Sequence, residues 1–177
     1  STSVIKPYKN QNGIAEISIN GPLMKRVPWV LSFLFGIQSM EIIGNVFNAA
    51  LNDKDIDAIF LDIDSPGGSV DGTQALADIV YNGRGKKPIL AFANGTMASA
   101  AYWIGSGADT IVLADSTSRI GSIGTVGVHF QYAEQAKQKG IQIHVFHSGQ
   151  YKRIGNVFEK LTKKDTEYID GQFEYLH

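Results

Sequence analysis

Three short segments of the chain carry the residue types that acyl-transfer chemistry uses. Ser99 lies in the run GTMASAAYW over 95–103, Gly68 in SPGGS over 65–69, and Lys152 in SGQYK over 148–152. An acyl-transfer site needs a nucleophile, a base and N–H donors for the developing oxyanion. A serine hydroxyl, a desolvated lysine amine and the backbone N–H groups of Gly68 and Ala100 can fill these roles. Each segment alone has a simpler interpretation: Ser99 as a helix cap, Pro-Gly-Gly as a turn, and Lys152 as a solvated surface lysine.

Histidine is the usual base for a serine nucleophile, and none of the four histidines is well placed in the sequence. His129 lies beyond a glycine-rich turn and His144 lies inside an expected strand, and neither has an obvious aspartate partner. The histidines also lack the spacing of metal ligands, and the chain has no cysteine. We therefore expect no disulfide, no metal and no cofactor.

Length and composition favour one domain with a full core. The chain has 177 residues, 44% of them hydrophobic, and a net charge of −1, so no global field favours nucleic acid. We expect a single domain over 1–177. Its polar segment at 1–12 lacks signal-peptide character and is expected to be flexible, and its C-terminus is expected to be truncated.

The run VPWVLSFLF over 27–35 is too short to span a bilayer. We interpret it as a buried or oligomer-facing loop, with a flap near a peptide groove or a membrane surface as the alternative.

Hydrophobic periodicity predicts strands that alternate with helices. The expected strands are 13–20, 56–64, 88–93, 110–114 and 141–146, and the expected helices are 39–52, 69–81, 97–106, 132–139 and 162–175. Ser39 is the expected cap of the first helix. This order predicts an α/β fold with a mostly parallel sheet, whose functional groups gather beyond the carboxyl ends of the strands. At one such end, Asp62 and Asp64 are more consistent with a hydrogen-bonding device than with a pair of catalytic carboxylates.

The motifs together resemble those of a known family. They are LDIDSPGG over 61–68, MASAAYW over 97–103, ADTIV over 108–112, GSIG over 121–124 and SGQYK over 148–152. In this order and spacing they are similar to the signal peptide peptidase A family of Ser–Lys serine proteases, which have the Clp-protease/crotonase fold of repeated β-β-α units. The resemblance implies Ser99 as the nucleophile, Lys152 as the general base and the N–H groups of Gly68 and Ala100 as oxyanion donors. It also implies that Ser122 orients the lysine, beside the alternative that Ser122 is a turn residue.

Both dyad residues lie in one copy of the fold, as in the short members of that family. The segments SAAYW over 99–103, KRIGN over 152–156 and LTKKD over 161–165 look most like those of the phage head-maturation proteases. The resemblance implies a serine endopeptidase that works through an acyl-enzyme on an extended scaffold or capsid polypeptide, in the host cytoplasm or the prohead. It also implies a ring-shaped homo-oligomer. Two features depart from many relatives: Val157 replaces a proline, and Arg153 follows the lysine and either lowers its pKa or points away.

Other functions remain open at this point. One is a membrane-peripheral cellular protease that degrades remnant signal peptides. Another is a catalytically silent scaffold that binds peptides through the same groove. A third is a crotonase-like acyl-CoA enzyme, which would need neither Ser99 nor Lys152.

Overall fold

The computed structural model describes residues 7–176 and divides into two compact units, residues 1–123 and 124–177. Each unit is described by itself, and a single domain over 1–177 stays a prediction. Within the segment expected to be flexible, residues 1–6 lie outside the described part of the chain. Lys9–Gln11 forms strand β1, which pairs antiparallel with β2.

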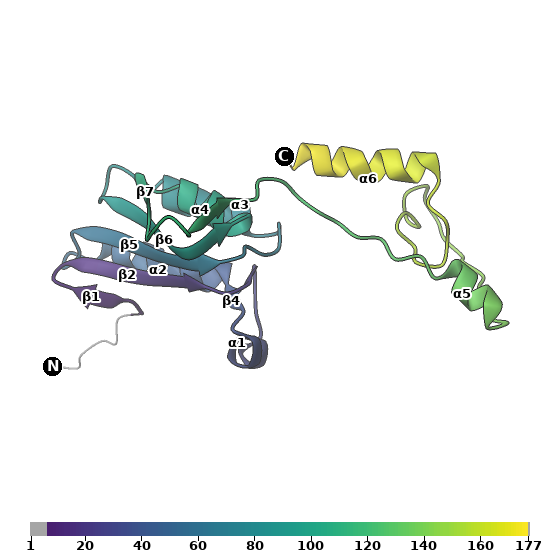
Figure 1. Cartoon of the computed structure of the whole chain (residues 1–177), viewed down its shortest axis with the longest axis horizontal. Coiled ribbons are helices and arrows are strands. Elements are labelled where there is room, and N and C mark those ends of the chain that lie inside the picture. The colour runs from purple at the N-terminus through teal and green to yellow at the C-terminus, as the bar shows by residue number, and fades with distance from the viewer. Residues whose placement is uncertain (1–6, 177) are drawn as a thin grey trace. The chain divides into compact units, whose positions relative to one another are not determined.

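The first unit is built on a mostly parallel sheet (Figure 1), which confirms the α/β prediction. Four parallel strands lie side by side in the order β2 (Ile14–Asn20), β5 (Ala58–Ser65), β6 (Ile89–Ala98) and β7 (Thr110–Leu113). The short strand β8 (Arg119–Gly121) pairs with the end of β6. A second, two-stranded sheet joins β3 (Leu23–Met24) to β4 (Gln38–Ser39).

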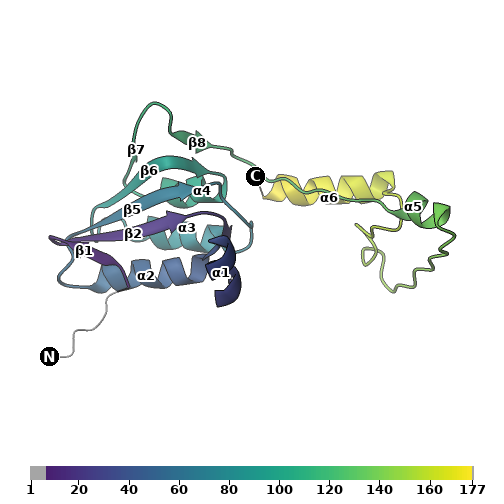
Figure 2. The ribbon, with the colours of Figure 1, turned by 60° about the horizontal axis from the view of Figure 1, so that its bottom comes forward.

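Helices α2 (Met40–Asn52), α3 (Thr73–Tyr81) and α4 (Ala100–Ser106) cover one face of the sheet (Figure 2). Strand side chains alternate in burial, so Ile17, Leu61 and Ala91 point into the core that these helices close. The side chain of Ser39 accepts the N–H of Ile42 at 3.4 Å, which confirms the predicted cap of α2.

Two helices begin later than periodicity predicts. The expected helix 69–81 begins at Thr73, because the N–H of Ser69 donates to the carbonyl of Leu23 and holds the preceding segment against β3. The expected helix 97–106 begins at Ala100, because Met97 and Ala98 still pair with β8.

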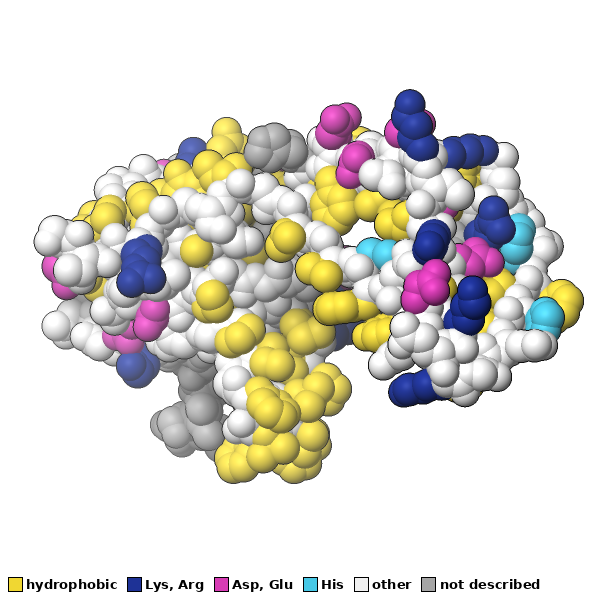
Figure 3. All heavy atoms as spheres, turned by 45° about the vertical axis from the view of Figure 1, so that its right-hand side comes forward, with side chains coloured by type: hydrophobic (Ala, Val, Ile, Leu, Met, Phe, Trp, Pro, Cys, Tyr) yellow, Lys and Arg dark blue, Asp and Glu magenta, His cyan; other side chains and the backbone are white. Residues whose placement is uncertain are grey.

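The apolar run near residue 30, expected as a buried or oligomer-facing loop, forms an exposed helix; whether it faces another copy stays a prediction. Helix α1 (Trp29–Phe35) has no buried residue, and the side chains of Trp29 and Phe33 are 78% and 81% exposed. Figure 3 shows hydrophobic side chains gathered below the sheet, where Figure 1 places α1. This helix is apolar on nearly every side, with Ser32 as its one polar residue.

The second unit contains two helices, α5 (Ala133–Gln138) and α6 (Lys163–Tyr175), as predicted. Thr162 and Asp165 form a capping box at the start of α6. The prediction of a strand at 141–146 is wrong, since this segment has no regular secondary structure. Its apolar side chains, among them Ile141 and Phe146, are exposed. No strand in the described part of the chain pairs with it, and alternation without a ladder partner does not make a strand.

Phe47 provides a test of the core. Its side chain is fully buried on α2 and lies close to Gly83, where an added Cβ would be 2.9 Å from the Phe47 ring. We expect Phe47→Ala to lower the free energy of unfolding by about 3–5 kcal/mol, measured by chemical denaturation, because it leaves a cavity. The matched control Ile42→Ala, on the exposed side of the same helix, is expected to cost about 0.5 kcal/mol or less. Equal losses for the two variants would contradict this packing.

Candidate active site

Ser99 occupies the turn between β6 and α4, in a strained backbone conformation. Its φ and ψ are 53° and −124°, and its N–H donates to the carbonyl of Gly121 at 2.8 Å. Ser99 stands at the N-cap position of α4, but its side chain makes no capping hydrogen bond, so the helix-cap interpretation is wrong. A serine on a sharp strand-to-helix turn, with its hydroxyl free of such a bond, is the arrangement that exposes a nucleophile.

Gly67 packs directly against the turn that contains Ser99. A Cβ added to Gly67 would lie 2.7 Å from the Cβ of Ser99 and 2.9 Å from the backbone nitrogen of Ala100. The φ of Gly67 is 96°, which L side chains rarely adopt. Position 67 therefore requires glycine twice over, for its conformation and for its contact. Sequence reasoning selected the neighbouring Gly68 and missed this contact, although the Pro-Gly-Gly motif contains both residues.

The N–H of Gly68 is left free by the way this turn is held. Leu23 donates its N–H to the carbonyl of Gly67 at 2.9 Å and accepts the N–H of Ser69 at 2.9 Å. Leu23 thus bridges to the residues that flank Gly68, so the N–H of Gly68 points away from Leu23. Ala100 is the first residue of α4, so its N–H has no acceptor within the helix. Both predicted oxyanion donors adjoin the contact between Gly67 and Ser99.

Ser65 holds the Pro66-Gly67-Gly68 segment, which we call the glycine turn, through its side-chain hydroxyl. Sequence reasoning missed this role. Its buried hydroxyl donates to the carbonyl of Gly21 at 2.7 Å and accepts the N–H of Gly67 at 3.1 Å. The N–H of Gly21 in turn donates to the carbonyl of Asp64 at 2.9 Å. The only signal for this in the sequence is a serine directly before the Pro-Gly-Gly motif.

Ser122 directly follows Gly121, whose carbonyl accepts the N–H of Ser99. It is exposed and has a φ of 57°, a left-handed conformation that is common in turns. This conformation is consistent with the turn interpretation. The role of Ser122 in orienting a lysine stays a prediction.

Lys152 belongs to the second unit, whereas Ser99, Gly68, Ala100 and Ser122 belong to the first. It is exposed on a turn that is anchored by its neighbours. The ring of Tyr151 stacks on that of Tyr168 in α6, with centroids 4.9 Å apart. The side chain of Arg153, the residue after Lys152, points toward Glu159. Its Nη1 lies 3.8 Å from Oε2 of that glutamate. Lys152 as general base stays a prediction.

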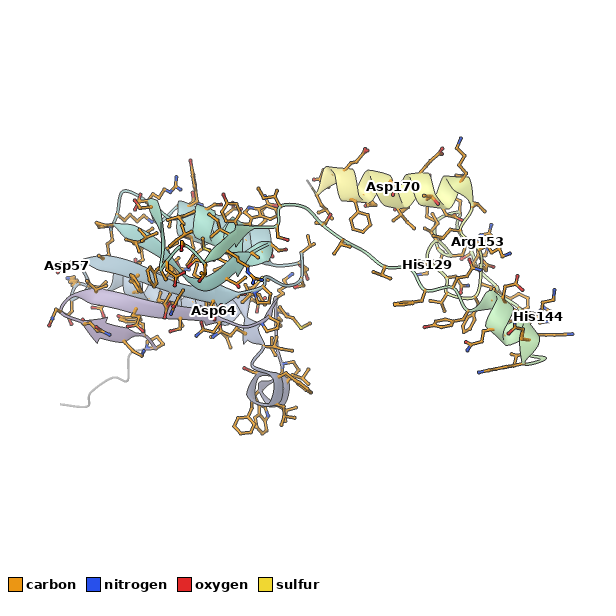
Figure 4. The ribbon with its side chains drawn as sticks, viewed as in Figure 1. Asp57, Asp64, His129, His144, Arg153 and Asp170 are labelled. Atoms are coloured by element: carbon orange, nitrogen blue, oxygen red, sulfur yellow. The ribbon has the colours of Figure 1, made fainter. Side chains whose placement is uncertain are left out.

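Among the described residues, histidines and aspartates do not form an alternative catalytic or metal site. His129, His144 and Arg153 lie in the second unit, and Asp57 and Asp64 stand at opposite ends of β5 (Figure 4). Nε2 of His129 is buried without a hydrogen-bond partner in the part of the chain that is described. Over residues 7–176, no group of three or more His, Asp or Glu side chains could hold a metal ion, and no helix is long and apolar enough to cross a membrane.

Asp64 acts as the predicted hydrogen-bonding device at the end of a strand. Its Oδ1 accepts the N–H of Thr96 in β6 at 2.9 Å. Asp62, the other residue of that pair, has a buried Oδ1 without a hydrogen-bond partner among the described residues. The two carboxylates therefore differ in role.

Solved structures resemble the chain at low identity. One is the 1510-N membrane-bound stomatin-specific protease with a substrate peptide, 19% identical, which covers 66% of this chain and 47% of that one with a TM-score of 0.47. An enoyl-CoA hydratase/isomerase family member is 15% identical over 58% of this chain and 45% of that one, with a TM-score of 0.43. ClpP1 from Listeria monocytogenes is 19% identical over 60% of this chain and 50% of that one, with a TM-score of 0.37.

Curated relatives are more similar in sequence. The head-tail preconnector protein GP5 of Enterobacteria phage P21 is 38% identical over 87% of this chain and 30% of its own length. The capsid assembly protease C of Escherichia phage lambda is 32% identical over 96% of this chain and 38% of its own length. The chain thus spans about a third of the length of these relatives. The model of peptidase family S49 matches residues 82–177, more than half of the chain and the part that contains Ser99, Ser122 and Lys152. The chain therefore belongs to peptidase family S49.

Proposed function

We propose that this protein is a serine endopeptidase that uses Ser99 as its nucleophile and Lys152 as its general base. The observation that carries the proposal is the strained, uncapped Ser99 with the backbone of Gly67 packed against it. Strain at one serine between a strand and a helix has a cost of about 1–3 kcal/mol, and such outliers cluster at active sites. Membership of family S49 supports the same reaction class.

The proposed reaction proceeds through an acyl-enzyme. Neutral Lys152 takes the proton of the Ser99 hydroxyl while Oγ attacks the scissile carbonyl carbon. The oxygen of that carbonyl becomes an oxyanion, which the N–H groups of Gly68 and Ala100 stabilise. The protonated lysine then gives its proton to the leaving amine, the peptide C–N bond breaks, and water hydrolyses the ester. Ser122 is proposed to orient the amine of Lys152.

The proposed substrate is an extended segment of a scaffold or capsid polypeptide. The names of the two phage relatives support this class, since they describe a capsid assembly protease and a head-tail preconnector. We accordingly propose that the protein acts in the host cytoplasm or in the assembling prohead. An extended substrate suits the Pro-Gly-Gly segment, because a peptide added as a strand is recognised through main-chain hydrogen bonds.

The protein is further proposed to act as a homo-oligomeric ring, with α1 in the interface between copies. A seven-residue helix that is apolar on nearly every side and has no buried residue needs an apolar partner. The basic residues before α1 do not mark an anionic partner, because Lys25 pairs with Asp71 at 2.9 Å and Arg26 pairs with Glu41 at 2.8 Å.

Replacing the proposed base tests the dyad. We expect Lys152→Ala to lower kcat for a capsid- or scaffold-derived peptide by at least about 100-fold, because general-base catalysis contributes on that order. The control Lys139→Ala removes an exposed lysine of the same unit and is expected to keep full activity. Undiminished cleavage by Lys152→Ala would remove the dyad.

Crowding the glycine turn tests the proposed oxyanion site. We expect Gly67→Ala to lower kcat at least about tenfold in a peptide-cleavage assay, since its Cβ would press on Ser99 and Ala100. Gly85→Ala is the matched control: Gly85 has a φ of 76° with nothing within 4 Å of an added Cβ, so it shares the backbone strain without the contact. Equal activity of the two variants would argue against a site at Gly67.

Removing the apolar character of α1 tests the assembly. We expect the wild-type protein to form an oligomer in light scattering, and Phe33→Glu to shift it toward the monomer, because a buried charge would have no partner. Phe146→Glu, at another highly exposed phenylalanine outside α1, serves as the control and should leave the oligomer intact. A monomeric wild-type protein would contradict the ring.

A further inference from the structure

The register between β5 and β6 changes just before the candidate site. Ile63 pairs with Ala93, whereas Ser65 pairs with Met97, so one residue of β5 stands opposite three residues of β6. The single residue is Asp64 and the three are 94–96. Strand β6 therefore carries a two-residue bulge, and such bulges occur next to active sites, where they re-aim the residues that follow.

The bulge determines which residue of β6 reaches the glycine turn. If the register of Ile63 and Ala93 continued, Gly67 would lie opposite Met97. With the register of Ser65 and Met97, Gly67 comes opposite Ser99, which agrees with its close approach to the Cβ of Ser99. Two residues of strand correspond to about 6–7 Å along β6. Without the bulge, Ser99 would be displaced from Gly67 by that length.

The carboxylate of Asp64 occupies the bulge. Its Oδ1 accepts the N–H of Thr96 at 2.9 Å. The N–H of Ser99 points toward β8, and because backbone groups alternate along a strand, the N–H of Thr96 points the other way, toward β5. Gly95 leaves room for the carboxylate, since a Cβ there would lie 2.9 Å from Oδ1. The φ of Gly95, 109°, also requires glycine.

We propose that Asp64 is a positioning residue: its carboxylate holds the bulge of β6 through Thr96 and so places Ser99 beside Gly67. Asp64 acts on Ser99 through the backbone of β6, because its carboxylate accepts the N–H of Thr96. The kinetic consequence rests on the proposed peptidase function. The hydrogen bond to Thr96 does not, and it can be measured in a protein without activity.

The test compares Asp64→Ala with Asp64→Asn, whose amide oxygen can still accept from Thr96. In Asp64→Ala we expect kcat to fall at least tenfold with KM within about twofold, and the amide hydrogen of Thr96 to exchange at least tenfold faster. Asp64→Asn should stay within about threefold of wild type in both measurements. The control Asp62→Asn changes the preceding carboxylate on the same face of β5, before the bulge, and should behave as wild type.

Gly95→Ala provides a second route, because its Cβ would displace the same carboxylate. Its loss of kcat should not add to that of Asp64→Ala in the double variant, since both changes break the same contact.

If Asp64→Ala does not fold, Gly95→Ala is expected to show the loss of kcat and the faster exchange of the Thr96 amide hydrogen. Unchanged exchange of Thr96, or an unchanged kcat, in a folded Asp64→Ala or Gly95→Ala variant would overturn the proposal. Inactive wild-type protein would reject the peptidase function, while the exchange of Thr96 would still decide whether Asp64 holds the bulge.

Discussion

The close approach of the Gly67 backbone to Ser99 and Ala100 is the constraint on which the rest of the first unit depends. Two chain segments more than thirty residues apart can come this close only where one of them has no Cβ. Ser65 holds the glycine turn from one side, and Leu23 holds it from the other through two backbone hydrogen bonds. On the facing segment, the carbonyl of Gly121 fixes the N–H of Ser99. Each of these contacts uses backbone atoms or a buried hydroxyl, so the turn is held without any charged residue at its centre.

The two units contribute differently to the proposed chemistry. The first supplies a packed sheet with one helical face, and a rigid frame of this kind suits a nucleophile that must be held in a strained conformation. The second supplies Lys152 on an exposed turn whose neighbour Tyr151 stacks against α6. Lysine works as a base only where its surroundings favour the neutral amine. In the proposed enzyme, Lys152 must therefore be desolvated before it can act as a base. Without that desolvation, the arrangement around Ser99 would be present but inactive.

Much of the fold follows from local patterns in the sequence. Alternation predicted β2, and the capping side chain of Ser39 marked the start of α2. The bulge could not be predicted in this way, because Asn94 and Gly95 are typical of a strand end. Strand β6 continues through them because Asp64 and β8, both distant in sequence, bond to the residues that follow.

The same limitation explains two further differences between prediction and structure. Residues 141–146 alternate like a strand, but a strand needs a ladder partner, which alternation does not supply. The run at 27–35 is expected as a loop that is buried or faces another copy, and in the structure its residues 29–35 form an exposed helix. At the site, residue types and spacing selected Ser99, Gly68 and Ala100, and the structure brings these together. Gly67 and Leu23 act through backbone geometry and Ser65 through a buried hydroxyl, and the sequence carries little signal for these contacts beyond the Pro-Gly-Gly motif.

The most direct measurement is the site of covalent modification by an acylating substrate. The protein would be incubated with an activated ester of a capsid-derived peptide, quenched in acid and analysed by peptide mass spectrometry. The account predicts one acyl group on Ser99 in the wild-type protein, and its loss in Lys152→Ala. An acyl group on another residue, or equal labelling of Ser99 in both proteins, would contradict a Ser99–Lys152 mechanism.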